Sequence, residues 1–178
     1  GASADVPMMH LQRNLRYAGT DAYQAIALPY FGRELELVAI MPAEGEFTSF
    51  VESVSAENIA AIAESLRPTE VALGFPKFEI ESTVPLKQRL QALGMLQAFE
   101  PIADFSLIGM VFIRDAFHQA VIRLDEEGTE AGAATAYVGV PVSQPPPPIP
   151  VTFDHPFVFF IRDVETNALL FVGHYSSP

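Results

Sequence analysis

The stretch LDEEGTEAGAATAYVGVPVSQPPPPIPVTFDHPF, residues 124–157, organises the chain, because its three parts follow different physical rules. Residues 126–135 are small and polar and have almost no side-chain bulk. Residues 137–142 favour a β-strand apart from Gly139, and residues 143–150 are stiff because each proline fixes φ and favours an extended polyproline path. Such a segment is poorly suited to packing in a hydrophobic core and well suited to presenting its backbone to another protein.

The small-residue part allows two interpretations. Residues 128–136 contain good helix formers, but two glycines and the absence of an apolar stripe argue against a packed amphipathic helix. The composition is compatible with a flexible Ala/Gly loop. The alternative is a strand that slides between other strands, where small side chains matter most.

A resemblance to a known family favours the sliding strand. The string EEGTEAGAATA, followed by a variable segment and then DHPFVFFIRDVETNALLFVGHYSSP, resembles the reactive-centre region and C-terminus of the serpin family. The resemblance implies a reactive-centre loop at about residues 126–150 within one serpin-like region, residues 6–178. A whole serpin also has an N-terminal half of helices and large-sheet strands, and these residues resemble no part of that half.

Composition excludes several classes of partner. The 178 residues carry a formal net charge of −12, and lysines and arginines are few, so we expect no nucleic-acid partner. No apolar run is long enough to cross a membrane, so we expect a soluble chain without a membrane partner. Residues 1–5 lack the features of a leader and are interpreted as a cloning remnant or a trimmed end.

The absence of cysteine excludes a disulfide framework and a thiolate nucleophile, and gives no indication of the redox compartment. The family resemblance implies an extracellular or periplasmic location.

Strand-like patterns dominate the chain. Residues 6–11 begin a short strand, and two apolar runs at residues 23–30 and 35–41 are separated by a glycine-containing turn typical of a β-hairpin. The apolarity of residues 23–28 predicts burial on both faces. Two further apolar runs, at residues 157–161 and 169–172, predict a second hairpin of central strands.

Short helices and two more strands complete the pattern. Helical spacing over residues 46–67 predicts two helices, the second capped by Ser55. The strand at residues 70–80 contains Pro76, which indicates an edge, a bulge or a transfer between sheets. A short helix is expected at residues 86–93. The predicted fold is therefore α+β, with mainly antiparallel β-sheets and a few short helices, as in the C-terminal half of a serpin.

The last predicted strand before the hinge, residues 112–124, is important because it would lead directly into the loop. It contains His118, which we interpret as a hydrogen-bonded core histidine. The resemblance agrees, because serpins carry a histidine here in the shutter beneath the large sheet.

Catalytic and metal-binding motifs are absent from the sequence. There is no GxSxG elbow or HExxH motif, and the four histidines are too far apart in sequence for a local metal motif. We therefore expect no enzymatic activity, no metal site and no cofactor.

The resemblance implies suicide inhibition of a serine protease by loop insertion. Counting along the loop as in the family places the scissile bond at Val142-Ser143, and valine suits the small primary pocket of elastase-like proteases. Cleavage after Tyr137 would instead indicate a chymotrypsin- or subtilisin-like enzyme. The other protease-contacting residues are Val138, Gly139, Val140, Pro141 and Gln144. The hinge that would insert consists of Glu126, Glu127, Gly128, Thr129, Glu130, Ala131, Gly132, Ala133, Ala134, Thr135 and Ala136.

Two alternatives remain open at this point. The chain could be a truncated serpin fragment that proteases cut as a plain substrate, or a non-inhibitory serpin-like binding module. The inhibitor interpretation could also require a complementary N-terminal half as a separate chain. A strand left unpaired by the absence of that half would favour self-association.

Overall fold

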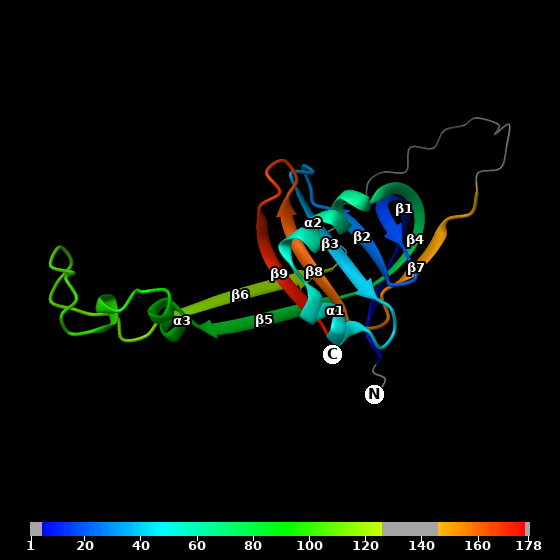
Figure 1. Cartoon of the computed structure of the whole chain (residues 1–178). Coiled ribbons are helices and arrows are strands. Elements are labelled where there is room, and N and C mark those ends of the chain that lie inside the picture. The colour runs from blue at the N-terminus through cyan, green and yellow to red at the C-terminus, as the bar shows by residue number, and fades with distance from the viewer. Residues whose placement is uncertain (1–4, 126–145, 177–178) are drawn as a thin grey trace. The chain divides into compact units, whose positions relative to one another are not determined.

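The computed structural model describes residues 5–125 and 146–176. It divides into two compact units: a sheet unit, formed by Gly1–Lys77 with Asp125–Pro178, and a hairpin unit, Phe78–Leu124. The elements (Figure 1) are β1 Met8–Gly19, β2 Tyr23–Pro29, β3 Leu35–Pro42, α1 Phe47–Ser53, α2 Ala56–Ser65, β4 Arg67–Pro76, β5 Phe78–Pro85, α3 Lys87–Ala92, the 3-10 turn η1 Gln97–Phe99, β6 Phe117–Leu124, β7 Ile149–Thr152, β8 Phe157–Asp163 and β9 Leu169–Tyr175. The predicted α+β fold with few helices is confirmed.

The sheet unit contains a seven-stranded sheet in the order β7-β4-β1-β2-β3-β8-β9. Every neighbouring pair is antiparallel except β4 and β7. The predicted first hairpin is confirmed: β2 and β3 pair along their length, and the turn contains Gly32 at φ 81°. The first strand is longer than predicted, because β1 finds partners in β4 over its first part and in β2 over its last residues.

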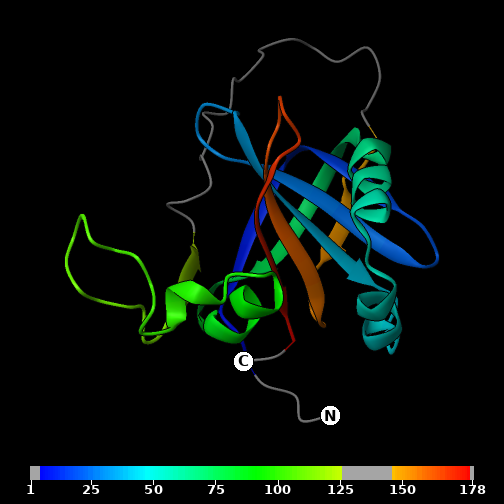
Figure 2. The same cartoon turned by 60° about the vertical axis from the view of Figure 1, so that its left-hand side comes forward.

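Helix α2 covers one face of this sheet (Figure 1). Its first turn is capped as predicted, since the backbone N–H of Asn58 donates to Ser55 Oγ at 3.2 Å. The helix buries Ile59, Ile62 and Ala63 against a cluster that includes Phe160 of β8. Figure 2 shows α1 and α2 following one another along this side of the sheet.

On the opposite face of the sheet, aromatic side chains from strands that are not neighbours contact one another. Phe75 of β4 and Phe157 of β8 have ring centroids 5.2 Å apart, and Phe153 contacts both at 4.7 and 5.2 Å. In a flat sheet β4 and β8, which have three strands between them, would be roughly 19 Å apart at the normal strand spacing. The sheet is therefore strongly curled, and its concave side holds an aromatic core.

A buried ionic cluster links three strands and α2. Arg16 of β1 and Arg162 of β8 both donate to the carboxylate of Glu36 on β3, at 3.0 Å and 2.8 Å. Arg16 also donates to the carbonyl oxygen of Ala63 at the end of α2. The side chains of Glu36 and Arg162 are 5% and 9% exposed, whereas that of Arg16 is 35% exposed. One carboxylate thus holds two guanidinium groups between the sheet and its helix.

Replacing Glu36 with glutamine is expected to lower the free energy of unfolding by about 2 kcal/mol, because hydrogen bonds between charged groups are lost inside the protein. The partial exposure of Arg16 keeps the effect below that of a fully buried pair. Urea unfolding followed by circular dichroism measures it. The matched control is Glu70→Gln on the exposed side of β4, which should change stability by less than about 0.5 kcal/mol. Equal effects of the two changes would contradict the role of the cluster.

The prediction that residues 157–161 and 169–172 form two central strands is wrong for the second. β8 and β9 do form a hairpin, and β8 is buried between β3 and β9. β9 is an edge strand, and its apolar residues Leu169, Leu170, Phe171 and Val172 are each 42–58% exposed. An apolar run indicates that a strand has side chains suited to burial. It does not indicate whether other parts of the described chain pack over those side chains.

The hairpin unit is a long two-stranded ribbon of β5 and β6 (Figure 1). Its register runs from Phe78 opposite Leu124 to Pro85 opposite Phe117. The transfer between sheets predicted at Pro76 is confirmed, because β4 ends there in the large sheet and β5 begins at Phe78 in the ribbon. The predicted helix at residues 86–93 is observed as α3, with Gly94 at φ 100° just beyond it.

The strand predicted at residues 112–124 is shorter than expected, because β6 begins only at Phe117. Residues 112–116 have no strand partner, since β5 ends at Pro85, which is the residue opposite Phe117. The alternation of apolar residues therefore predicted a strand that is too long at its N-terminal end, because the pairing with β5 begins only at Phe117.

Candidate reactive-loop site

The predicted scissile bond, protease-contacting residues and hinge all lie at residues 126–145, outside the described residues. The structure describes the two stems of this segment instead. The N-terminal stem is β6, in the hairpin unit, and the C-terminal stem runs from residue 146 into β7, in the sheet unit. The two stems therefore belong to different sheets, one in each unit.

The N-terminal stem is held on one side only. β6 pairs with β5, and across this pair Arg123 donates to the Glu79 carboxylate at 2.9 Å while Gln119 donates to Glu81. The hydrogen bonds from Arg123, and then its positive charge, lower the pKa of Glu79. Within residues 5–125 and 146–176 no strand pairs with the other edge of β6. Among the described residues, β6 is therefore an edge strand of its two-stranded sheet.

The C-terminal stem is fixed much more firmly. β7 lies parallel to β4, with Ile149 opposite Val71 and Val151 opposite Leu73. Val151 is 1% exposed, and the backbone N–H of Phe153 donates to the carbonyl oxygen of Gly74 at 2.9 Å. Figure 2 shows β7 beside β4 at the edge of the sheet.

His155 is a residue of this stem that the sequence analysis missed. Its Nε2 lies 2.7 Å from the carbonyl oxygen of Pro42 at the end of β3, and its Nδ1 lies 2.8 Å from Oδ1 of Asp154. The imidazole thus joins the turn after β7 to a strand distant in sequence. No sequence motif indicated the contact with Pro42, which lies far away in the chain.

His118 does not occupy a core position in this structure. It lies on β6 opposite Val84, and its side chain is exposed. The expectation of a buried, hydrogen-bonded histidine is therefore wrong for the described chain. The same face of the ribbon is buried only at its other end, where Leu124 and Phe78 are 4% and 8% exposed, so the burial does not extend to His118.

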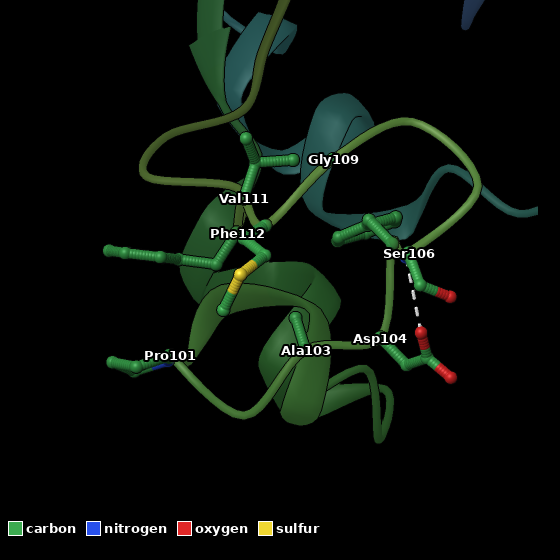
Figure 3. Close-up of a pocket in the computed structure, with 9 residues that line it drawn as sticks. Pro101, Ala103, Asp104, Ser106, Gly109, Val111 and Phe112 are labelled. Carbon is green, nitrogen blue, oxygen red and sulfur yellow. Dashed lines mark hydrogen bonds between the residues drawn. The ribbon is translucent and has the colours of Figure 1, made fainter.

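One pocket, of about 490 Å³, lies in the segment between η1 and β6 (Figure 3). Its walls are largely apolar, and its acidic group is Asp104, whose side chain accepts a hydrogen bond from the backbone N–H of Ser106 at 3.1 Å. This contact, with the Ser106 hydroxyl as the larger cause, lowers the pKa of Asp104. The polar side chains among its lining residues are those of Asp104 and Ser106.

Metal and membrane sites were also sought in the described residues. No group of three or more His, Cys, Asp or Glu side chains in residues 5–125 and 146–176 is placed to hold a metal ion. None of the helices in the same ranges is both long and apolar enough to span a bilayer.

Comparison with known proteins identifies the family. The family model described as Serpin (serine protease inhibitor) matches residues 1–178. The chain belongs to the serpin family. An uncharacterised serpin-like protein of Thermococcus kodakarensis is 38% identical over 179 residues, which cover 97% of this serpin chain. Serpin B4 of Homo sapiens is 34% identical over 183 residues, again 97% of the chain.

The structural comparison agrees with the sequence comparison. The crystal structure of the thermophilic serpin tengpin in the native state matches with a TM-score of 0.71 and 30% identity, over 97% of this chain. The serpin chain spans only 42% of the Thermococcus protein, 46% of Serpin B4 and 46% of tengpin. The family is generally inhibitory rather than catalytic, and the described residues correspond to less than half of a relative.

Proposed function

We propose that this serpin chain is the loop-bearing part of a serine protease inhibitor. The observation that supports this function is the difference in strand pairing and burial between the two stems. One stem is β6, which has an open edge, and the other is β7, which is paired and buried. A segment that joins an open strand to a fixed one can be presented to a protease and can then add to the open sheet after cleavage.

Loop insertion beside β6 is the proposed trapping step. The protease serine attacks the carbonyl carbon of the scissile bond and forms an acyl-enzyme, with release of the new amino terminus. The hinge, residues 126–136, then pairs as a strand with the open edge of β6. Thr129, Ala131, Ala133 and Thr135 are small enough to enter between packed strands, so insertion competes with hydrolysis of the acyl-enzyme.

The proposed scissile bond is Val142-Ser143, and the proposed targets are elastase-like proteases. A β-branched side chain of this size fills a small primary pocket and cannot reach the acid at the base of a trypsin-like pocket. Cleavage after Tyr137 by a chymotrypsin- or subtilisin-like enzyme is the competing outcome.

A complementary N-terminal half is the second proposed partner. One face of the ribbon of β5 and β6 is exposed, and its residues Phe117 and Val121 are 65% and 52% exposed. A two-stranded sheet of this kind is only marginally stable without further cover. The portion of the relatives that this chain does not span is the proposed cover, whether it precedes these residues in one protein or is a separate chain. Self-association through open strand edges is expected where that cover is absent.

The bait assignment can be tested by changing specificity. Val142→Arg is expected to make trypsin cleave after residue 142 and to slow cleavage by elastase by roughly tenfold or more, because a charged side chain does not fit the small pocket. Intact-mass spectrometry of the products locates the cut. The matched control is Val140→Arg, because the new arginine precedes Pro141 and trypsin acts poorly on bonds to proline nitrogen. Elastase cleavage mainly after Tyr137 would contradict the Val142 assignment.

A further inference from the structure

The C-terminal stem combines two properties that each oppose proteolysis. Pro146 and Pro147 are exposed, Pro148 is partly exposed, and Pro150 is exposed on β7. A serine protease binds its substrate as an extended strand and must protonate the nitrogen of the bond that it breaks. The ring of a proline crowds the space through which the catalytic histidine must deliver that proton, and the proline nitrogen has no N–H to pair with the protease. The bonds that precede Pro147, Pro148 and Pro150 are therefore poor substrates although they are exposed.

The remaining bonds of the stem are protected by pairing. Pro148-Ile149 and Pro150-Val151 are not bonds to proline nitrogen, but both lie at or within β7, which pairs with β4 through Ile149, Pro150, Val151 and Thr152. Val151 and Phe153 are 1% and 2% exposed, so their side chains would have to leave the core before a protease could bind this backbone. Cleavage there requires local opening of the sheet.

We propose that residues 146–153 form a protease-resistant strut that confines cleavage to the chain N-terminal to it. The proposal rests on the proposed function, and it names the feature that limits where a protease can cut. Proline chemistry protects the bonds before Pro147, Pro148 and Pro150, and pairing of β7 with β4 protects the other bonds of the strut. The Gln144-Pro145 bond is also a bond to a proline nitrogen, so we expect it to resist cleavage as well.

The strut has a consequence for the choice of protease. If the bond after Val142 is cut, only Ser143 and Gln144 on the leaving side have backbone N–H groups before the prolines begin. Enzymes that depend on a long paired strand on that side are disfavoured. Recognition must therefore come mainly from residues before the scissile bond. The cleaved leaving end stays attached to β7, because the strut remains intact.

The test is a cleavage map with subtilisin, which has broad specificity, at a low ratio of protease to chain. Intact-mass spectrometry is expected to find C-terminal products that begin at or before residue 144 and none that begin between Pro146 and Phe153. In the variant Pro146→Ala/Pro147→Ala/Pro148→Ala, products that begin at residues 146–148 should increase by roughly tenfold or more, because the proline rings no longer crowd the leaving nitrogens. The control is Pro101→Ala, an exposed proline in the hairpin unit.

The outcomes separate this proposal from the proposed function. Products of the unchanged chain that begin within residues 146–153 would overturn the strut, as would a triple variant with an unchanged map. Val151→Ala provides a second measurement, because weakening of β7 should allow a cut at Pro148-Ile149; protection that survives this change would contradict the pairing argument. None of these maps depends on trapping, so a chain that is cut as a plain substrate would contradict the inhibitor function and could still confirm the strut.

Discussion

Phe160→Ala is expected to lower the free energy of unfolding by about 3 to 5 kcal/mol. Phe160 is fully buried on β8 and belongs to the cluster in which Ile59 and Ile62 of α2 pack on the sheet. Removing its ring loses the apolar transfer energy and leaves a cavity between the helix and the sheet, where strands on both sides limit collapse. Urea unfolding followed by circular dichroism gives the difference between the two proteins.

Phe171→Ala is the matched control for this prediction. Phe171 lies on the neighbouring strand β9 but is 42% exposed. Its truncation is expected to cost about 1 kcal/mol, because much of the ring is already in contact with water. Equal losses for the two phenylalanines would show that the described burial does not reflect the packing in solution.

Ala133→Arg is expected to change the chain from an inhibitor into a substrate. The proposed mechanism requires residue 133 to enter between strands, and an arginine buried there without a partner would cost several kcal/mol. Since about 1.4 kcal/mol changes a rate tenfold, hydrolysis of the acyl-enzyme should then exceed insertion by well over tenfold. The number of inhibitor molecules consumed per protease molecule blocked measures this ratio, and the initial rate of loop cleavage should stay unchanged.

Ala134→Arg controls for charge and size at the neighbouring position. Successive side chains of a strand point to opposite faces, so residues 133 and 134 cannot both face the interior of an inserted hinge. The mechanism predicts a large effect at Ala133 and a small one at Ala134. Loss of trapping by both variants, or by neither, would contradict insertion as a strand.

Local sequence rules predicted several parts of the fold correctly. The turn between β2 and β3 contains a glycine at positive φ, Ser55 caps α2, and Pro76 marks the transfer from the large sheet to the ribbon. Each of these features depends on a few neighbouring residues and on backbone geometry. They could therefore be recognised without knowledge of the partners distant in sequence.

Features that depend on distant partners could not be predicted. The parallel pairing of β7 with β4, the two arginines around Glu36 and the contact of His155 with Pro42 all join residues far apart in the chain. The exposure of Phe171 and His118 has the same origin, because burial depends on what covers a strand and not on the strand's own composition. For the candidate site, the family resemblance predicts a loop at about residues 126–150, and the structure describes the strands on either side of residues 126–145.

We propose that this serpin chain traps a protease as an acyl-enzyme. The most direct measurement is denaturing gel electrophoresis, with mass spectrometry, after elastase is mixed with the chain alone and with the chain supplemented by an N-terminal serpin half. We expect a denaturation-resistant band in the supplemented sample, in which the elastase serine is esterified by the carboxyl group of Val142. Complete cleavage of the loop without such a band in that sample would contradict the account.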